Sequence, residues 1–151
     1  MPRRPSQRKP RRRVKPLPNC RAILICEKII KDAFFGTISL IGVLTRLAVR
    51  RFPGKTSPFF LFVQLAHGIG SYELTIEIQD DQKGLVLART NPLPLKFEHR
   101  TEVRDLLIPI PAIELQHAGG YTVAVFANGN EIGRQGFDTP DEEVRDAKDA
   151  S

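Results

Sequence analysis

Apolar and polar positions alternate most regularly between Tyr72 and Ile78 (YELTIEI). This period of two predicts a β-strand with one face in a core and the other in water. The run Phe59–Leu65 (FFLFVQL) is apolar on both faces, as expected of a central strand covered on both sides. A third alternating run, Tyr121–Phe126, leads into Asn128-Gly129, a dipeptide typical of a type I′ hairpin turn. A returning strand is therefore predicted over Glu131–Phe137.

The same reasoning extends to eight strands with turn signals between them. Short strands at this spacing indicate an antiparallel sandwich or barrel and not a parallel α/β sheet. Helical periodicity predicts only a helical turn over Glu27–Phe35 and a marginal exposed helix over Glu142–Ala150. The expected strands cover Cys20–Cys26, Thr37–Val49 with a bulge or bend at Gly42, Phe59–Leu65, Tyr72–Ile78, Leu85–Arg89, Leu106–Ile110, Tyr121–Phe126 and Glu131–Phe137.

One local motif favours the sandwich over the barrel. Leu115, Gly119 and Tyr121 form L-x-x-x-G-x-Y directly before an alternating strand and its closing hairpin. This pattern is typical of a tyrosine corner, in which the tyrosine hydroxyl bonds to backbone a few residues upstream. The predicted fold is an all-β, immunoglobulin-like antiparallel β-sandwich of about seven to eight strands. Tyr121 is expected to be a structural residue bonded near Leu115–His117.

Charge divides the chain into three parts. Residues 1–16 contain eight lysines and arginines, four prolines and no acidic residue, whereas acids predominate after residue 137. A segment with so few apolar side chains cannot offset the entropy lost on ordering. We therefore expect a basic Arg/Pro-rich disordered arm over residues 1–18, a β-sandwich domain over 19–138, and an acidic flexible tail over 139–151.

Two groups of basic residues are candidate contact sites. The arm has the charge to bind nucleic acid or an acidic surface through phosphate contacts, but it carries no aromatic residue for base stacking. A solvated tail or an upstream extension explains the same composition. The second group surrounds the end of the second strand, where arginines lie among aromatic residues. This arrangement is typical of a contact patch for a protein or a phosphate, and the alternative interpretation is a solvated strand end beside a core strand. The arm residues are Arg3, Arg4, Arg8, Lys9, Arg11, Arg12, Arg13 and Lys15, and the patch residues are Arg46, Arg50, Arg51 and Lys55.

Residues suited to catalysis or metal binding are scattered along the chain. His67, His99 and His117 lie in three different loop or strand-end regions, where His67 and His117 are expected to be exposed. Cys20 and Cys26 would be about 20 Å apart in one extended strand, too far for a disulfide. We therefore expect two free thiols, no metal site, no cofactor and no enzymatic activity. A weak hydrolase would require a pocket that brings His67 or His117 close to a carboxylate.

Apolar runs in the chain are short. None approaches the 18–20 residues, roughly, of a membrane span, and the basic arm is not followed by the apolar stretch of a secretory signal. A cytoplasmic location without a membrane span is therefore expected, and two unpaired thiols agree with a reducing compartment.

The folded region resembles a small uncharacterised bacterial domain family of unknown function. The resemblance begins in Cys20–Val43 with L-I-C-E-K-I-I-x-D-A-F-x-G-T-I-S-L-I-G-V, and it covers roughly Cys20 to Phe137. It implies an immunoglobulin-like sandwich and contributes no activity and no site residues. The basic arm departs from the family pattern. Later similar stretches are Arg51-Phe52-Pro53, Phe59–Leu65, Tyr72–Asp80 and Gly120–Gly129.

The leading functional hypothesis is a non-enzymatic binding or protein-interaction module with an unidentified protein partner. The alternative is a nucleic-acid or acidic-surface contact made through the arm. The sequence leaves open the ligand, the oligomeric state and whether residues 1–18 are a functional arm.

Overall fold

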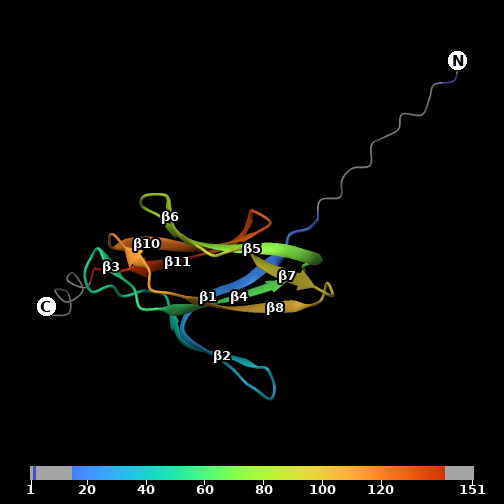
Figure 1. The fold of residues 1–151 in the computed structure, drawn as a ribbon, viewed down its shortest axis with the longest axis horizontal. Helices are drawn as coiled ribbons and strands as arrows, with labels where there is room; N and C mark the ends of the chain where they lie inside the picture. The colour runs from blue at the N-terminus through green and yellow to red at the C-terminus, as the bar shows by residue number, and fades with distance from the viewer. Residues whose placement is uncertain (1, 3–14, 142–151) are drawn as a thin grey trace.

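Two antiparallel sheets lie face to face in the computed structural model, which describes Pro2 and residues 15–141 (Figure 1). Alternating apolar residues build these sheets, because each strand can turn one side chain in two toward the opposite sheet. The first sheet has the order β2-β1-β4-β8 and the second has the order β11-β10-β5-β6, with β7 also paired to β5. The strands of the first sheet are β1 (Asn19–Lys31), β2 (Ile38–Leu44), β4 (Phe59–Ala66) and β8 (Val103–Ile110). Those of the second are β5 (Gly70–Asp80), β6 (Leu85–Arg89), β7 (Leu93–Phe97), β10 (Gly119–Ala127) and β11 (Asn130–Thr139).

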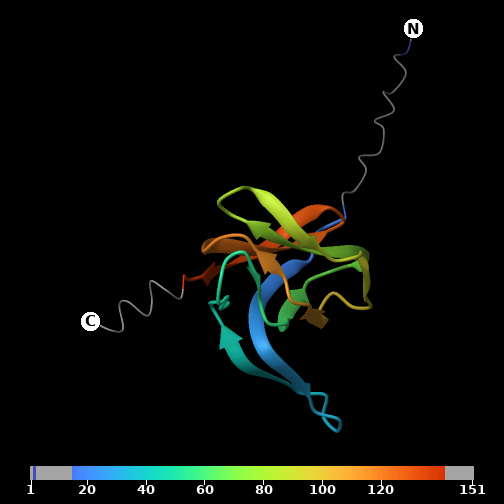
Figure 2. The same ribbon diagram turned by 60° about the vertical axis from the view of Figure 1, so that its left-hand side comes forward.

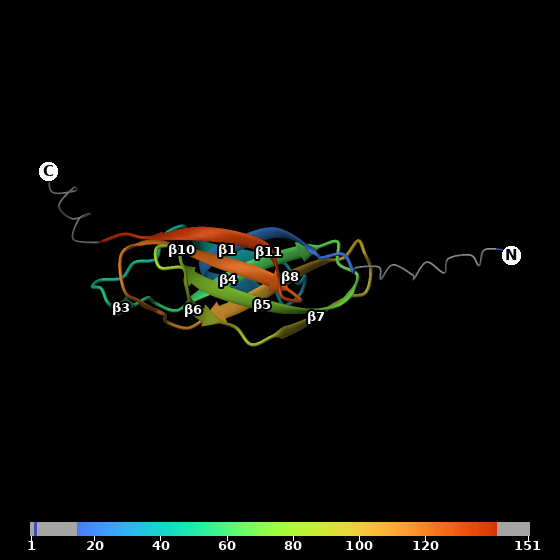
Figure 3. The ribbon, with the colours of Figure 1, turned by 90° about the horizontal axis from the view of Figure 1, so that it is seen from above.

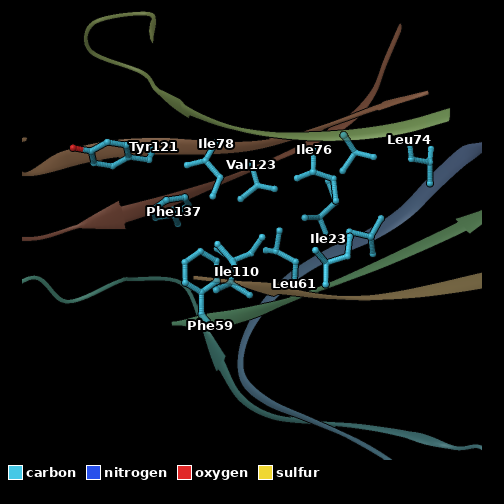
Figure 4. Close-up of a cluster of buried hydrophobic side chains, with 14 of the residues drawn as sticks. Ile23, Phe59, Leu61, Leu74, Ile76, Ile78, Ile110, Tyr121, Val123 and Phe137 are labelled. Carbon is cyan, nitrogen blue, oxygen red and sulfur yellow. The ribbon is translucent and has the colours of Figure 1, made fainter. Parts of the chain in front are cut away.

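The core fills the space between the sheets (Figures 3 and 4). Strand β4 lies between two neighbours in its sheet, and its Leu61, Val63 and Leu65 side chains are fully buried. From the other sheet, Leu74 and Ile76 of β5 are buried in the same core and point toward the sheet that carries Leu61. The period of two therefore directs one face of each inner strand into a common core.

The connection of the strands is immunoglobulin-like. In one sheet β4 lies between β1 and β8, as strand B lies between strands A and E of an immunoglobulin domain. In the other sheet β10 lies between β5 and β11, as strand F lies between strands C and G of that domain. All eight expected strands are present. Three further strands are short or at an edge: β3 (Gly54–Lys55) pairs with β9 (Glu114–Leu115), and β7 pairs with one end of β5. Strand β7 contains Pro94, which an edge strand tolerates.

The predicted helical turn over Glu27–Phe35 is wrong. Strand β1 continues to Lys31 and turns back into β2, so this region is a β-hairpin. The Asp32 carboxylate Oδ1 accepts hydrogen bonds from the amides of Phe34 and Phe35 at 2.8 and 2.9 Å, and Gly36 adopts φ +67°. These local bonds reverse the chain where a helix would have continued it.

The expected strand Thr37–Val49 ends early, at Leu44. Beyond it the chain crosses to the second sheet, where Arg46 and Val49 form isolated parallel bridges with Asp138 and Asp141. The physical reason is burial, because Leu47 and Val49 are only 5% and 2% exposed in this new position. Gly42, where a bulge or bend was expected, has φ +66°, and the register between β1 and β2 is the same on both sides of it.

Several expectations fall outside the described residues. These are the helix over Glu142–Ala150 and the disorder expected of most of the arm and tail. In residues 15–141, no helix is long and apolar enough to cross a membrane.

Candidate interaction surfaces

The β1–β2 hairpin (residues 27–44) projects beyond the sandwich (Figure 2). Its tip carries Phe34 and Phe35, whose exposed fractions are 93% and 85%. Large apolar side chains are exposed along both of its strands, among them Ile30, Ile41 and Val43. Strand β1 leaves the core after Cys26, and within the hairpin Leu44 packs against the core cluster whereas the tip lies away from it.

The free edge of the hairpin is β2. Within the described sheets β2 pairs with β1 on one side, and its other side is the end of the sheet. The stretch Ala33–Thr45 (AFFGTISLIGVLT) holds no charged residue and no proline. Soluble proteins usually protect sheet edges with charges, prolines or a covering segment, so this edge has the properties of a contact strand.

The basic patch lies on the chain between β2 and β4, and three of its four residues line one hollow. We call this the cationic hollow: it has a volume of about 540 Å³ and contains no acidic lining residue. Arg46 lies outside it, beside a neighbouring hollow near Phe59. The cationic hollow is lined by Ala48, Val49, Arg50, Arg51, Pro53, Gly54, Lys55 and Ser57.

Backbone contacts hold the wall of the cationic hollow in place. The Thr56 amide donates to the Ile113 carbonyl at 2.9 Å, and the Ile113 amide donates to the Thr56 hydroxyl at 3.2 Å. A Cβ added at Gly54 would lie 2.1 Å from the Arg51 carbonyl oxygen, so only glycine fits beneath this turn. These contacts fix the backbone around Gly54 and Thr56, next to the cationic residues that line the hollow.

The arm is represented by Lys15, since its seven other basic residues lie outside the described part of the chain. Lys15 Nζ lies 3.9 Å from the centroid of the Tyr72 ring and also donates to the Ser71 carbonyl. The Tyr72 hydroxyl donates to the carbonyl of Pro16 at 2.6 Å. The base of the arm is thus attached to β5, and nucleic-acid binding through the arm stays a prediction.

His117 is half-buried and paired, contrary to the exposed position expected for it. Its Nε2 lies 2.7 Å from Asp80 Oδ2, and its Nδ1 lies 2.7 Å from the carbonyl oxygen of Ala118. Asp80 is 2% exposed, and its other oxygen accepts bonds from the amides of Gln82 and Lys83. His67 and His99 are exposed.

This geometry favours the charged forms of His117 and Asp80. Both ring nitrogens of His117 face acceptor oxygens, so the imidazole satisfies both only when it is doubly protonated. Hydrogen bonds to Ala118 and to Asp80 accordingly raise the pKa of His117. Burial alone would raise the pKa of Asp80, but the bonds from His117 and from the two amides outweigh it and lower that pKa. The pair is a charged link between β5 and the loop before β10.

Tyr121 lies in the corner position. Its side chain is fully buried, and its hydroxyl donates to the His117 carbonyl at 2.6 Å, the bond that a tyrosine corner requires. The ring is stacked between His117 and Phe137, with centroid distances of 5.5 and 5.6 Å. Every polar and aromatic contact of Tyr121 is therefore internal to the fold.

Tyr121→Phe keeps the ring and removes this hydrogen bond. We expect the free energy of unfolding to fall by about 1 kcal/mol, rising toward 3 kcal/mol if the His117 carbonyl stays unpaired. Urea unfolding followed by circular dichroism measures the change, and partner binding should be unaffected. Unchanged stability together with lost binding would place Tyr121 in a binding site instead.

His117 is hydrogen-bonded within the fold, and the two cysteines are partly or fully buried. The hydrolase hypothesis required a histidine near a carboxylate, and His117 meets that condition, but both of its nitrogens are engaged by protein acceptors. Cys20 and Cys26 are free thiols whose pKa values are raised by burial. In the described part of the chain, no group of three or more His, Cys, Asp or Glu residues lies together as metal ligands.

The chain is similar to part of the Pseudomonas fluorescens alkylpurine DNA glycosylase AlkC, in a structure bound to DNA containing an abasic site analog. The identity is 14% and the TM-score is 0.42, and the match covers 64% of this chain and 27% of that one. It is also similar to an immunoglobulin-like protein from Pseudomonas aeruginosa, with 14% identity, a TM-score of 0.37, and coverage of 83% and 98% of the two chains. No curated protein matches. The model of one family matches residues 21–138, and the chain therefore belongs to that family of unknown function, DUF6941.

Proposed function

We propose that this chain is a non-enzymatic protein-interaction module that binds its partner through the β1–β2 hairpin. The observation that carries the proposal is the uncharged edge strand β2 together with the turn that precedes it, in which two phenylalanines are almost fully exposed. The proposed partner supplies an extended segment that adds to β2 as a further strand, together with an apolar recess for Phe34 and Phe35.

Burial of apolar surface supports this mode of binding. Isolated exposed apolar residues are ordinary on protein surfaces, whereas a continuous group at the end of a projecting element is typical of an interaction site. Aromatic side chains contribute most of the binding energy in many interfaces, because each buries a large area at low entropic cost. The unpaired amides and carbonyls of β2 would supply the hydrogen bonds of strand addition.

The absence of catalytic activity is part of the same proposal. It is supported by the engagement of both His117 nitrogens in internal bonds and by the complete burial of the Cys26 thiol. Neither group is free to abstract a proton or attack a substrate in the described arrangement.

The test is quantitative affinity capture from cells of the source organism, followed by binding to the identified partner in purified form. Phe34→Ser with Phe35→Ser, and separately Ile41→Lys in the edge strand, should each reduce retention at least about tenfold, the factor for roughly 1.4 kcal/mol of lost contact. All variants should unfold at similar urea concentrations, since these side chains lie outside the core.

The control variant is Leu85→Ser with Val86→Ser. It removes two exposed apolar side chains, 53% and 47% exposed, from edge strand β6 of the other sheet. Capture should be unchanged in this variant. The proposal is wrong if capture survives both hairpin changes, or if the purified partner binds the wild-type chain and the hairpin variants equally.

A further inference from the structure

The first sheet is apolar on its outer side as well as on its core side. The run Phe59–Leu65 predicts a strand covered on both sides, but within residues 15–141 the strands of the second sheet lie on one side of β4 and the other side faces outward (Figure 1). The alternate residues on this outer side are absent from the core cluster and do not pack against it. We call them the outer apolar face: Leu24 and Cys26 of β1, Val43 of β2, Phe60 and Phe62 of β4, and Leu107 and Pro109 of β8.

Strand pairing brings these residues into two adjacent rows. One row runs across three strands, from Leu24 through Phe62 to Leu107, and the next runs across four, from Val43 through Cys26 and Phe60 to Pro109. Val43 and Leu107, at opposite edges, are 52% and 36% exposed. A continuous apolar patch of this kind on a protein surface is typical of an interaction site.

The two ends of the outer apolar face carry opposite charges. Lys28 lies two positions beyond Cys26 in β1, opposite Ile41. Two positions before Leu24, the row of Ala22 and Gln64 ends in Asp105 of β8. Lys28 and Asp105 are exposed, and neither forms a salt bridge with another described residue. The basic and the acidic end are therefore equally far from the middle of the face.

The size of the outer apolar face suits a specific protein interface. From the row of Ala22 to that of Lys28 the strands extend about 20 Å, and four strands side by side are roughly 19 Å wide. The flat footprint is thus about 400 Å², and projecting side chains make the accessible area larger. Two such faces in contact would bury about 1,000 Å² or more in total, the area that a specific interface requires.

The ends of the chain do not offer a matching apolar segment. Residues 1–14 contain Met1 and Val14 as their apolar residues, and residues 142–151 contain Val144, Ala147 and Ala150. Segments of this composition cannot replace the water over a row of phenylalanine and leucine side chains. The face of another molecule is the better match, and interfaces between identical chains are the most apolar class.

We propose that the outer apolar face binds the same face of a second copy of this chain, with the strands of the two copies antiparallel. A two-fold axis across the strands then places the Lys28 end of each copy over the Asp105 end of the other, whereas parallel strands would bring like charges together. Sheets pack face to face in this way about 10 Å apart, with their side chains interdigitated. The contact does not depend on Phe34, Phe35 or the partner proposed for them.

Sedimentation equilibrium of the full chain, at concentrations up to about 200 µM, tests this pairing. The wild-type chain should form a dimer with a Kd in the micromolar range. Leu107→Lys and, separately, Val43→Lys should each raise that Kd at least about tenfold, because both copies would then bring an ammonium group into the apolar contact. The matched control is Leu85→Lys, which changes a leucine that is 53% exposed in edge strand β6 of the second sheet and should leave the Kd unchanged.

Three sedimentation results would overturn the proposal. The first is a wild-type chain that stays monomeric throughout this concentration range. The second is a dimer that survives both Leu107→Lys and Val43→Lys. The third is a dimer that dissociates in Phe34→Ser with Phe35→Ser but not in the two face variants, since the hairpin tip would then be the contact. Partner capture by the hairpin is measured separately, so the two proposals can fail independently.

Charge reversal provides a second readout with substitutions at exposed positions. At low salt Lys28→Glu should raise the Kd of the dimer about fivefold, because each copy then sets an acidic end against the acidic end of the other. Lys28→Glu combined with Asp105→Lys should return the Kd to within about twofold of wild type. Lys83→Glu, in the turn between β5 and β6, is the matched control and should have no effect. Failure of the double reversal to restore the dimer, or equal weakening by Lys83→Glu, would overturn the antiparallel pairing.

Discussion

Asp80→Asn is expected to lower the free energy of unfolding by about 3 kcal/mol at neutral pH. Asp80 is almost fully buried, and it uses both carboxylate oxygens, one for His117 and the other for the Gln82 and Lys83 amides. Asparagine has a single acceptor oxygen, so either the amides or the imidazolium loses its partner. Removing one member of a buried charged pair leaves the other uncompensated, at a cost of this size.

The pH dependence of this effect has a defined sign. A group with a raised folded pKa stabilises the fold at low pH, and this contribution is lost as the pH rises through that pKa; His117 is such a group. A group with a lowered folded pKa stabilises the fold at higher pH, and this contribution is lost as the pH falls through that pKa; Asp80 is such a group. Stability should therefore be greatest between the lowered pKa of Asp80 and the raised pKa of His117.

Urea unfolding followed by circular dichroism across this pH range measures both effects. In Asp80→Asn the loss of stability on the alkaline side should become smaller, because His117 keeps its bond to Ala118 but no longer has its carboxylate partner. The control is Asp81→Asn: Asp81 is the exposed neighbour, and its Oδ1 accepts a 2.7 Å bond from the Thr122 hydroxyl. That variant should lose less than about 1 kcal/mol. An unchanged pH profile in Asp80→Asn would show that the pair is not linked to folding.

The second large expected effect is the loss of unfolding free energy when a buried leucine of β4 is truncated, compared with the truncation of an exposed isoleucine of the hairpin. Leu61→Ala in β4 should cost about 3 kcal/mol, because Leu61 is completely buried between the sheets and its truncation leaves a cavity. Ile41→Ala in the hairpin should cost less than about 0.5 kcal/mol, since Ile41 is 43% exposed and lies beyond the core. Denaturant unfolding of both variants measures the difference. Similar losses would mean that the hairpin is folded into the same cooperative unit as the core.

The sheet strands could be predicted from the sequence because alternation and runs of apolar residues are local signals. The tyrosine corner was predictable for the same reason, as Leu115, Gly119 and Tyr121 lie close together in the chain. Beyond Leu44 the prediction failed, because Leu47 and Val49 join the opposite sheet through contacts with residues near 138–141. Only the folded arrangement brings these distant segments together.

The hairpin tip was missed although its turn carries a readable signal. Asp32 and Gly36 form the same D-x-x-x-G turn as Asp80 and Gly84. In each turn the aspartate Oδ1 accepts bonds from the amides two and three residues later, and the glycine, with φ +67° or +65°, donates to the aspartate carbonyl. The apolar residues Phe34 and Phe35 concealed the first copy, since turns are usually recognised by polar composition.

The pairing of His117 with Asp80 could not have been predicted from spacing. The two residues are far apart in sequence, and they meet because the register of β5 and β10 places Tyr121 opposite Asp80. Sequence patterns predict which strands exist, whereas register decides which polar side chains meet at their ends. The buried charged pair is therefore a property of the assembled sandwich.

Strands β1 and β2 precede the other strands of the sandwich in the chain, and this order has a consequence for synthesis. Strands β1 and β2 are adjacent in sequence and are joined by a short turn, so they can pair once residue 44 has left the ribosome. The pairing of β1 with β4 must wait for residues 59–66, and the second sheet requires β10 and β11, which follow the other described strands in the chain. The hairpin can thus be completed, with its uncharged edge exposed, well before there is a sandwich to carry it, and a partner could meet this strand while the rest of the chain is still being translated.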